Sequence, residues 1–110
     1  MSIQHQQLAQ GAWQKLLFCE QMANIGSEVI RANKWKIKSR NDYAIMAADR
    51  AFELIDLTIE SQDKSARLKE LTRLRETVAD YFYGDNEYSS NTKNWENYFI
   101  PFTYLSRKGR

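Results

Sequence analysis

Glycine and proline are scarce in this chain of 110 residues, which contains four glycines and one proline. Neither residue occurs between Ser27 and Tyr83, a stretch longer than half of the chain. Tight turns depend on glycine and proline, and strand-rich domains need many such turns. The scarcity therefore argues against β-rich folds and predicts an all-α fold.

Cysteine and histidine are nearly absent, since Cys19 and His5 are the single examples of each. One cysteine forms no internal disulfide, and two such residues are too few for a zinc site of four Cys or His ligands. The sequence also lacks the Glu-x-x-His pairs of di-iron bundles and a glycine-rich phosphate loop. We therefore expect no metal, no cofactor and no enzymatic activity, and we predict no catalytic residue.

Long apolar runs are missing as well. No stretch approaches the ~20 apolar residues that cross a bilayer, and residues 1–10 are polar, unlike a signal peptide. We expect a cytoplasmic protein without membrane contact. A chain of this length is expected to form a single domain over residues 1–110, with flexible tails at 1–11 and 107–110.

Apolar residues recur at helical spacing in four segments. We expect helices over residues 12–36, from residue 41 to a turn at 61–64, over 65–83 and over 93–107. Ser39 and Asp42 have the spacing of a capping box for the second helix, and Asn41 is an alternative cap. Gly84 is placed to end the third helix. These elements predict an antiparallel up-and-down four-helix bundle.

The fourth helix is short and rich in aromatic residues. Large side chains at core spacing share one of its sides: Trp95, Tyr98, Phe99, Phe102 and Leu105. This spacing predicts that the helix docks onto the bundle through these side chains. A platform for stacking nucleic-acid bases is the alternative function of the aromatic residues.

Two positions leave alternatives open. Gly26 lies within the apolar face of the first helix, where it either allows close approach of another helix or is simply tolerated at about 1 kcal/mol. Pro101 either bends the fourth helix, by removing a hydrogen bond to Asn97, or marks the point where that helix begins.

The net charge is only +2, and basic and acidic blocks alternate along the chain. Segments 31–40 and 64–75 are mainly basic, whereas 41–63 and 76–96 are mainly acidic. A nucleic-acid-binding protein usually gathers positive charge on one face. The alternation instead favours complementarity between helices, either within the bundle or across an interface.

Four carboxylates on the second helix form a column with spacings of 4, 3 and 4 residues: Asp49, Glu53, Asp56 and Glu60. Two arginines, Arg67 and Arg75, fall within the apolar arc of the third helix. An antiparallel hairpin is expected to place Arg75 level with Asp49, and Arg67 near Asp56 and Glu60. We predict that these residues form a partly buried ionic network. A line of carboxylates does not surround a metal ion, so no metal site is expected there.

A second stripe on the first helix lies roughly opposite its core face and predicts an interface: Trp13, Leu17, Arg31 and Trp35. Trp and Arg are favoured at the energetic centres of interfaces. Met46 and Leu57, which flank the carboxylate column, are assigned to the same surface. The predicted partner is a second copy, with a dimer favoured, or another protein. Packing against the N-terminal tail or the 85–92 loop is the alternative.

Several segments resemble a family of small prokaryotic helical proteins without assigned function: ANIGSEV (23–29), RAFELIDLTI (50–59), RLKEL (67–71), RLRE (73–76) and DYFYGDNEY (80–88). The resemblance covers residues 13–104. It implies a compact bundle of about four helices and no activity, cofactor or catalytic residue. It also singles out six positions: Glu53, Asp56, Arg67, Arg73, Asn86 and Glu87.

These observations predict a non-enzymatic interaction or scaffold protein that self-associates, in a pathway that the sequence does not indicate. The alternative is a nucleic-acid-associated accessory protein, whose affinity should fall steeply with salt. Its basic contacts would come from segment 31–40 and the C-terminal tail: Lys34, Lys36, Lys38, Arg40, Arg107 and Lys108.

Overall fold

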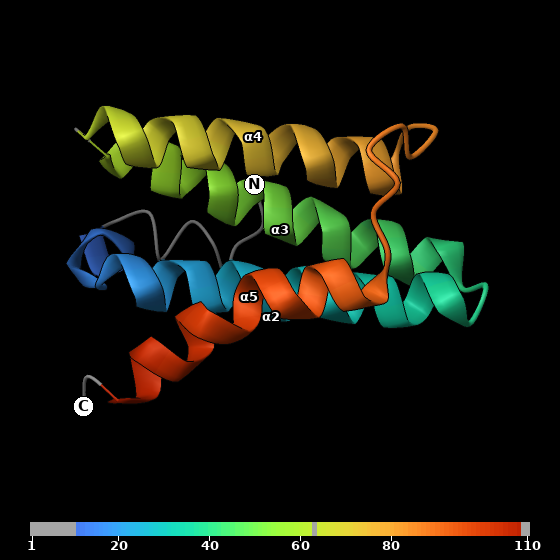
Figure 1. Ribbon diagram of the computed structural model, residues 1–110, viewed down its shortest axis with the longest axis horizontal. Helices are drawn as coiled ribbons and strands as arrows, with labels where there is room; N and C mark the ends of the chain where they lie inside the picture. The colour runs from blue at the N-terminus through green and yellow to red at the C-terminus, as the bar shows by residue number, and fades with distance from the viewer. Residues whose placement is uncertain (1–10, 63, 109–110) are drawn as a thin grey trace.

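The computed structural model describes residues 11–62 and 64–108, which contain four long helices (Figure 1). A short 3₁₀ helix, η2 (Trp13–Lys15), precedes α2 (Phe18–Ile37), α3 (Asn41–Ser61), α4 (Ser65–Phe82) and α5 (Thr92–Lys108). The described residues form no strand, so the predicted all-α fold is confirmed. The tails expected at 1–11 and 107–110 lie mostly outside the described residues, but Arg107 and Lys108 belong to α5.

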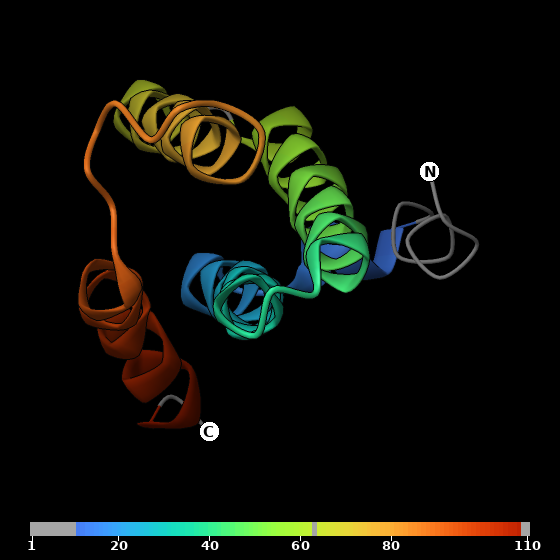
Figure 2. The ribbon, with the colours of Figure 1, turned by 90° about the vertical axis from the view of Figure 1, so that its right-hand side faces the viewer.

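Successive helices run in opposite directions and form the predicted antiparallel four-helix bundle (Figure 1). α2 packs against both α3 and α5, whereas α4 packs against α3. Viewed end-on, the helices therefore follow the order α4, α3, α2, α5 (Figure 2). The last and first helices of this order, α5 and α4, border a cavity.

The core forms where the apolar sides of the helices meet. Its largest fully buried apolar side chains come from η2 and all four helices: Trp13, Met22, Ile25, Val29, Ile55, Leu71, Val78 and Phe99. Each large aliphatic or aromatic side chain contributes about 1.5–3 kcal/mol when it leaves water. On α3 the buried face also contains small residues, Ala44, Ala47, Ala48 and Ala51, which allow close packing of helix backbones.

At Gly26, α5 approaches α2 so closely that the space for a side chain is filled. A Cβ atom at this position would lie only 2.6 Å from Cγ of Phe99 and 2.8 Å from its Cβ. The Phe99 ring is buried and therefore occupies the space that a larger residue at position 26 would need. Of the two alternatives for Gly26, the structure supports close helix approach.

The first predicted helix is interrupted, which corrects both its start and the role of Trp13. Leu16 and Leu17 are extended, with ψ of 147° and 154°, and the Glu20 carboxylate accepts the Leu17 N–H at 2.9 Å. The interruption directs η2 onto α3, where the Trp13 indole N–H donates to the Thr58 hydroxyl at 3.0 Å. Trp13 is thus a core residue, and its prediction as an interface residue is wrong.

The predicted caps of α3 are also wrong. Ser39 has a φ of 61° and belongs to the turn between α2 and α3. Arg40 occupies the position before α3, and no side chain caps the helix there. The predicted end of α4 is confirmed to within one residue, because the helix ends at Phe82 and Gly84 follows its cap.

α5 begins at Thr92, one residue earlier than predicted. Asn91 and Asn94 stabilise this end, because each side-chain oxygen accepts the other residue's backbone N–H, at 2.9 and 3.0 Å. The helix continues through Pro101, which excludes a start at that residue. The last part of α5 turns away from the other helices (Figure 1). Leu105 is 52% exposed, so its assignment to the core is wrong.

Candidate functional site

Of the pairings predicted between the carboxylate column and the two arginines, the structure shows an exposed ion pair between Asp56 and Arg75. The Arg75 Nε atom lies 2.9 Å from Asp56 Oδ1, and the two side chains are 48% and 50% exposed. The hydrogen bond that Arg75 donates to Asp56 raises the pKa of Arg75. A pair this exposed contributes about 0–1 kcal/mol, so the expectation of a partly buried network is wrong for this pair.

Asp49 and Arg67 contact other residues than the predicted ones. Asp56 lies opposite Arg75, and Asp49 accepts a hydrogen bond from Tyr83. The Arg67 guanidinium lies 4.6 Å from the centroid of the Phe18 ring, and Glu60, near the end of α3, is exposed.

The predicted interface residues do not form one surface. Leu57 is buried, because η2 packs on α3 and joins it in the core cluster, so its prediction as an interface residue is wrong like that of Trp13. Leu17 and Met46 are exposed but lie near opposite ends of the bundle, at the starts of α2 and α3 (Figure 1).

Two further residues of the predicted interface lie on α2. Arg31 is exposed and pairs with Glu28 of the same helix at 3.5 Å. Trp35 is half-buried, and its ring centroid lies 4.8 Å from that of Tyr43. Trp35 thus packs mainly within its own chain.

The basic residues of the nucleic-acid alternative form two separate groups. Lys34, Lys36, Lys38 and Arg40 lie at the end of α2 and the turn that follows, whereas Arg107 and Lys108 lie at the opposite end of the molecule (Figure 1). Lys36 donates to the Tyr81 carbonyl oxygen at 2.6 Å, so part of its charge is used within the bundle. A nucleic-acid-binding face gathers such residues together, and this arrangement does not.

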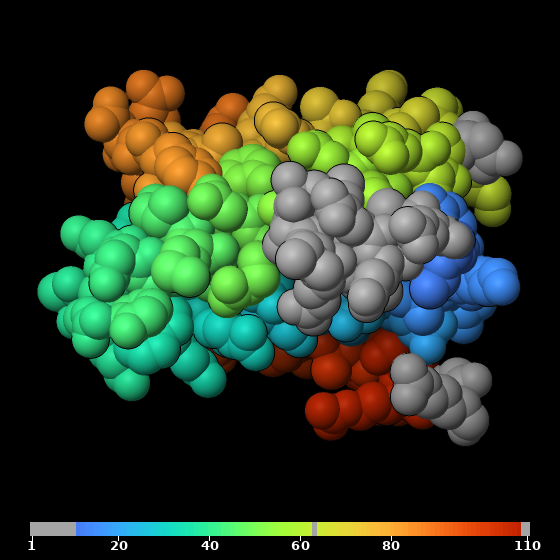
Figure 3. Space-filling model, turned by 180° about the vertical axis from the view of Figure 1, so that it is seen from behind, coloured from blue at the N-terminus to red at the C-terminus, as the bar shows by residue number. Residues whose placement is uncertain are grey.

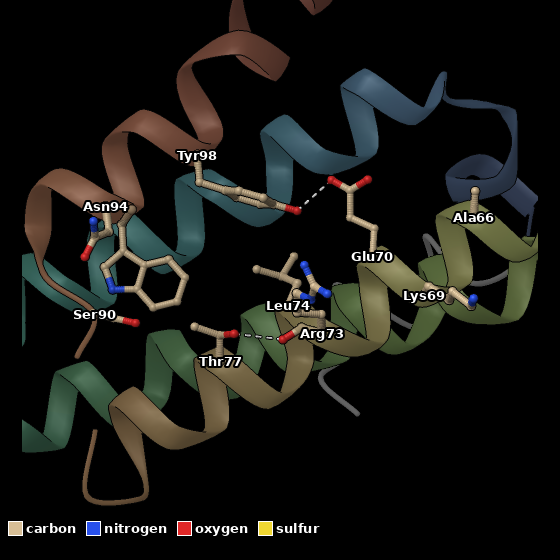
Figure 4. A pocket seen from close by; sticks show the side chains of 10 residues that line it. Ala66, Lys69, Glu70, Arg73, Leu74, Thr77, Ser90, Asn94 and Tyr98 are labelled. Atoms are coloured by element: carbon tan, nitrogen blue, oxygen red, sulfur yellow. Dashed lines mark hydrogen bonds between the residues drawn. The ribbon is translucent and has the colours of Figure 1, made fainter. Parts of the chain in front are cut away.

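The cavity between α4 and α5 has a volume of about 570 Å³, within the range typical of sites for small molecules. Leu74, Trp95 and Tyr98 supply its apolar walls, and Lys69, Glu70 and Arg73 supply charged groups. Figure 4 shows these charged residues along α4, with Tyr98 facing them from α5.

Tyr98 connects the two walls of this cavity. Its hydroxyl donates to Glu70 Oε1 at 2.8 Å (Figure 4). Burial, followed by the hydrogen bond to Glu70, raises the pKa of Tyr98. The Tyr98 hydroxyl thus donates to Glu70, which is the only carboxylate that lines the cavity among the described residues.

Trp95 has an unsatisfied polar group. The residue is 4% exposed and lines the cavity, and its ring lies within a cluster of aromatic residues on α4 and α5. Its indole N–H has no hydrogen-bond acceptor among the described residues. A buried donor without an acceptor costs about 1–3 kcal/mol, so this group calls for an explanation.

A second feature is the exposed side of α5. Glu96, Ile100, Tyr104 and Lys108 recur at intervals of four residues and are all exposed; we call them the α5 outer stripe. Ile100 and Tyr104 are 56% and 62% exposed. In the space-filling view, the last part of α5 projects at the edge of the molecule opposite α4 (Figure 3).

Sequence reasoning missed both features. The cavity joins residues of α4, the loop that follows it and α5. Arg73 was singled out through the family resemblance, whereas Trp95 and Tyr98 were named only as docking residues or as a platform for stacking bases. In the sequence, the α5 outer stripe consists of an acidic residue, two large apolar or aromatic residues and a basic residue, each four positions after the one before. Its exposure was not predictable, because the aromatic residues beside it all suggested docking.

No protein-family model, no curated protein and no solved structure matches this chain. The resemblance to uncharacterised prokaryotic helical proteins stays a prediction. None of the helices in the described part of the chain has the length and hydrophobicity to cross a membrane. No three His, Cys, Asp or Glu side chains within residues 11–62 and 64–108 gather as a metal site requires.

Proposed function

We propose that this protein is a non-enzymatic interaction protein that pairs with a second copy of itself through the α5 outer stripe. The observation that carries the proposal is the exposure of Ile100 and Tyr104 at the centre of this stripe. Clusters of exposed large side chains with polar residues around them are typical of protein–protein contacts.

The order of residues along the stripe is self-complementary. In an antiparallel pair of α5 helices related by a two-fold axis near residue 102, Glu96 faces Lys108 of the second copy, and Ile100 faces Tyr104. The same contacts recur on the other side of the axis. Two-fold dimers require such matching of one surface with itself, and the charges at the two ends of the stripe favour this register.

The free energies of the individual contacts indicate which of them stabilise the dimer. Complete burial of a side chain such as Ile100 contributes about 1.5–3 kcal/mol, whereas each exposed ion pair contributes about 0–1 kcal/mol. Association itself costs about 4–15 kcal/mol in lost motion. We therefore expect a dimer of modest affinity, stabilised by the apolar centre and aligned by the charged ends.

The test is sedimentation equilibrium of the wild-type chain and of Ile100→Asp over a wide range of concentrations. We expect the wild type to form a reversible dimer and Ile100→Asp to be monomeric. Ile37→Asp is the matched control, because Ile37 is 62% exposed at the end of α2 and lies outside the stripe. A monomeric wild type, or equal loss of dimer in both variants, would contradict the proposal.

A further inference from the structure

We propose that the cavity between α4 and α5 binds a small carboxylic acid with a planar apolar body. This inference is independent of the proposed dimer, because the cavity is lined by Trp95 and Tyr98 and the stripe lies on the exposed side of α5. Each can fail without the other.

The charge of the cavity favours an anion. Lys69 and Arg73 line it, and neither forms an ion pair with another described residue. Glu70, the opposing carboxylate, already accepts the Tyr98 hydroxyl. Arginine binds carboxylates through two parallel hydrogen bonds, so Arg73 is the residue that we expect to hold the acid group, with Lys69 adding positive charge.

The other polar groups of the cavity are mainly donors. The Trp95 indole N–H has no acceptor among the described residues. Asn94 uses its backbone N–H and its side-chain oxygen at the start of α5, which leaves its amide NH₂ as a donor. The residues that line the cavity thus offer more hydrogen-bond donors than acceptors. A ligand rich in hydrogen-bond acceptors would satisfy these donors.

The walls favour a flat apolar body. Trp95 and Tyr98 present aromatic rings on one side, and Leu74 presents an aliphatic side chain on the other. Sites of this kind bury most of a small ligand's surface and orient it with a few polar groups. A fused bicyclic acid fits this combination of size, flatness and charge within about 570 Å³.

The first test is isothermal titration calorimetry with 2-naphthoate as the probe and 2-naphthamide as its neutral counterpart. We expect one naphthoate per chain, and binding at least tenfold weaker for the amide and for the Arg73→Gln variant. Arg75→Gln is the matched control, because Arg75 lies two residues further along the same helix and pairs with α3; its affinity for naphthoate should equal that of the wild type.

The second test follows the three indole N–H signals in a nitrogen–proton correlation spectrum of the full chain, which contains three tryptophans. We expect naphthoate to shift the Trp95 signal and to leave that of Trp13, which is bonded to Thr58, in place. Three results would each overturn the proposal: no naphthoate binding, equal affinity for naphthoate and the amide, or binding without a shift of the Trp95 signal.

Discussion

Replacing Gly26 by alanine tests the packing that positions α5. The new Cβ would lie 2.6, 2.7 and 2.8 Å from Cγ, Cδ1 and Cβ of Phe99. A clash with the ring alone could be relieved by rotation, but a clash with the Phe99 Cβ requires the helix backbones to separate. Overpacking of this kind costs about 1–3 kcal/mol, and the clash at Cβ places the cost near the upper end.

The same substitution also brings a gain, because alanine favours a helix over glycine by about 1 kcal/mol. The expected result is a net loss of about 2 kcal/mol, which lowers Tm by roughly 8 °C in a domain of this size. Urea denaturation and calorimetry measure both quantities. Ser27→Ala, at the adjacent exposed position of α2, should change stability by less than about 0.5 kcal/mol. A Gly26→Ala variant as stable as the wild type would refute the close approach of α2 and α5.

Three further predictions concern single contacts. Thr58→Val removes the acceptor of the buried Trp13 indole N–H and should lower the free energy of unfolding in urea by about 1–3 kcal/mol; an unchanged value would show that the bond is dispensable. Arg75→Ala breaks the exposed pair with Asp56 and should cost about 0–1 kcal/mol, less at high salt; a loss of about 3–5 kcal/mol would show that the pair is buried after all. The raised pKa of Tyr98 means that the unfolded chain loses this proton first, so the stability that it contributes is complete below about pH 10 and falls as the pH rises further. Urea midpoints measured across that range should fall less steeply for Tyr98→Phe than for the wild type, and parallel curves would contradict the assignment.

The helices could be predicted because their signals are local. The spacing of apolar residues and the placement of glycine and proline predicted the ends of the four helices to within a few residues, except for the start of the first helix. That start depends on a hydrogen bond between Trp13 and Thr58, which are 45 residues apart. Nothing near Leu16 or Leu17 in the sequence forbids a continuous helix, so the break could not be predicted from local propensity.

The candidate sites were less predictable because they depend on how the helices pack. The carboxylate column was identified correctly as a row on one helix, but its partners depend on the register between α3 and α4. That register places Tyr83, not Arg75, opposite Asp49. The cavity beside Arg73 likewise exists only because α4 and α5 pack on different neighbours and leave space between their facing sides.

The symmetric pairing of α5 is tested most directly by mixing two charge variants, Glu96→Lys and Lys108→Glu, in sedimentation equilibrium. Alone, each variant places like charges together at both ends of the pair, so each should dimerise more weakly than the wild type. In the mixture, every facing pair has opposite charges, and we predict a heterodimer with the affinity of the wild-type dimer. A mixture that remains as monomeric as its components would contradict antiparallel pairing through the α5 outer stripe.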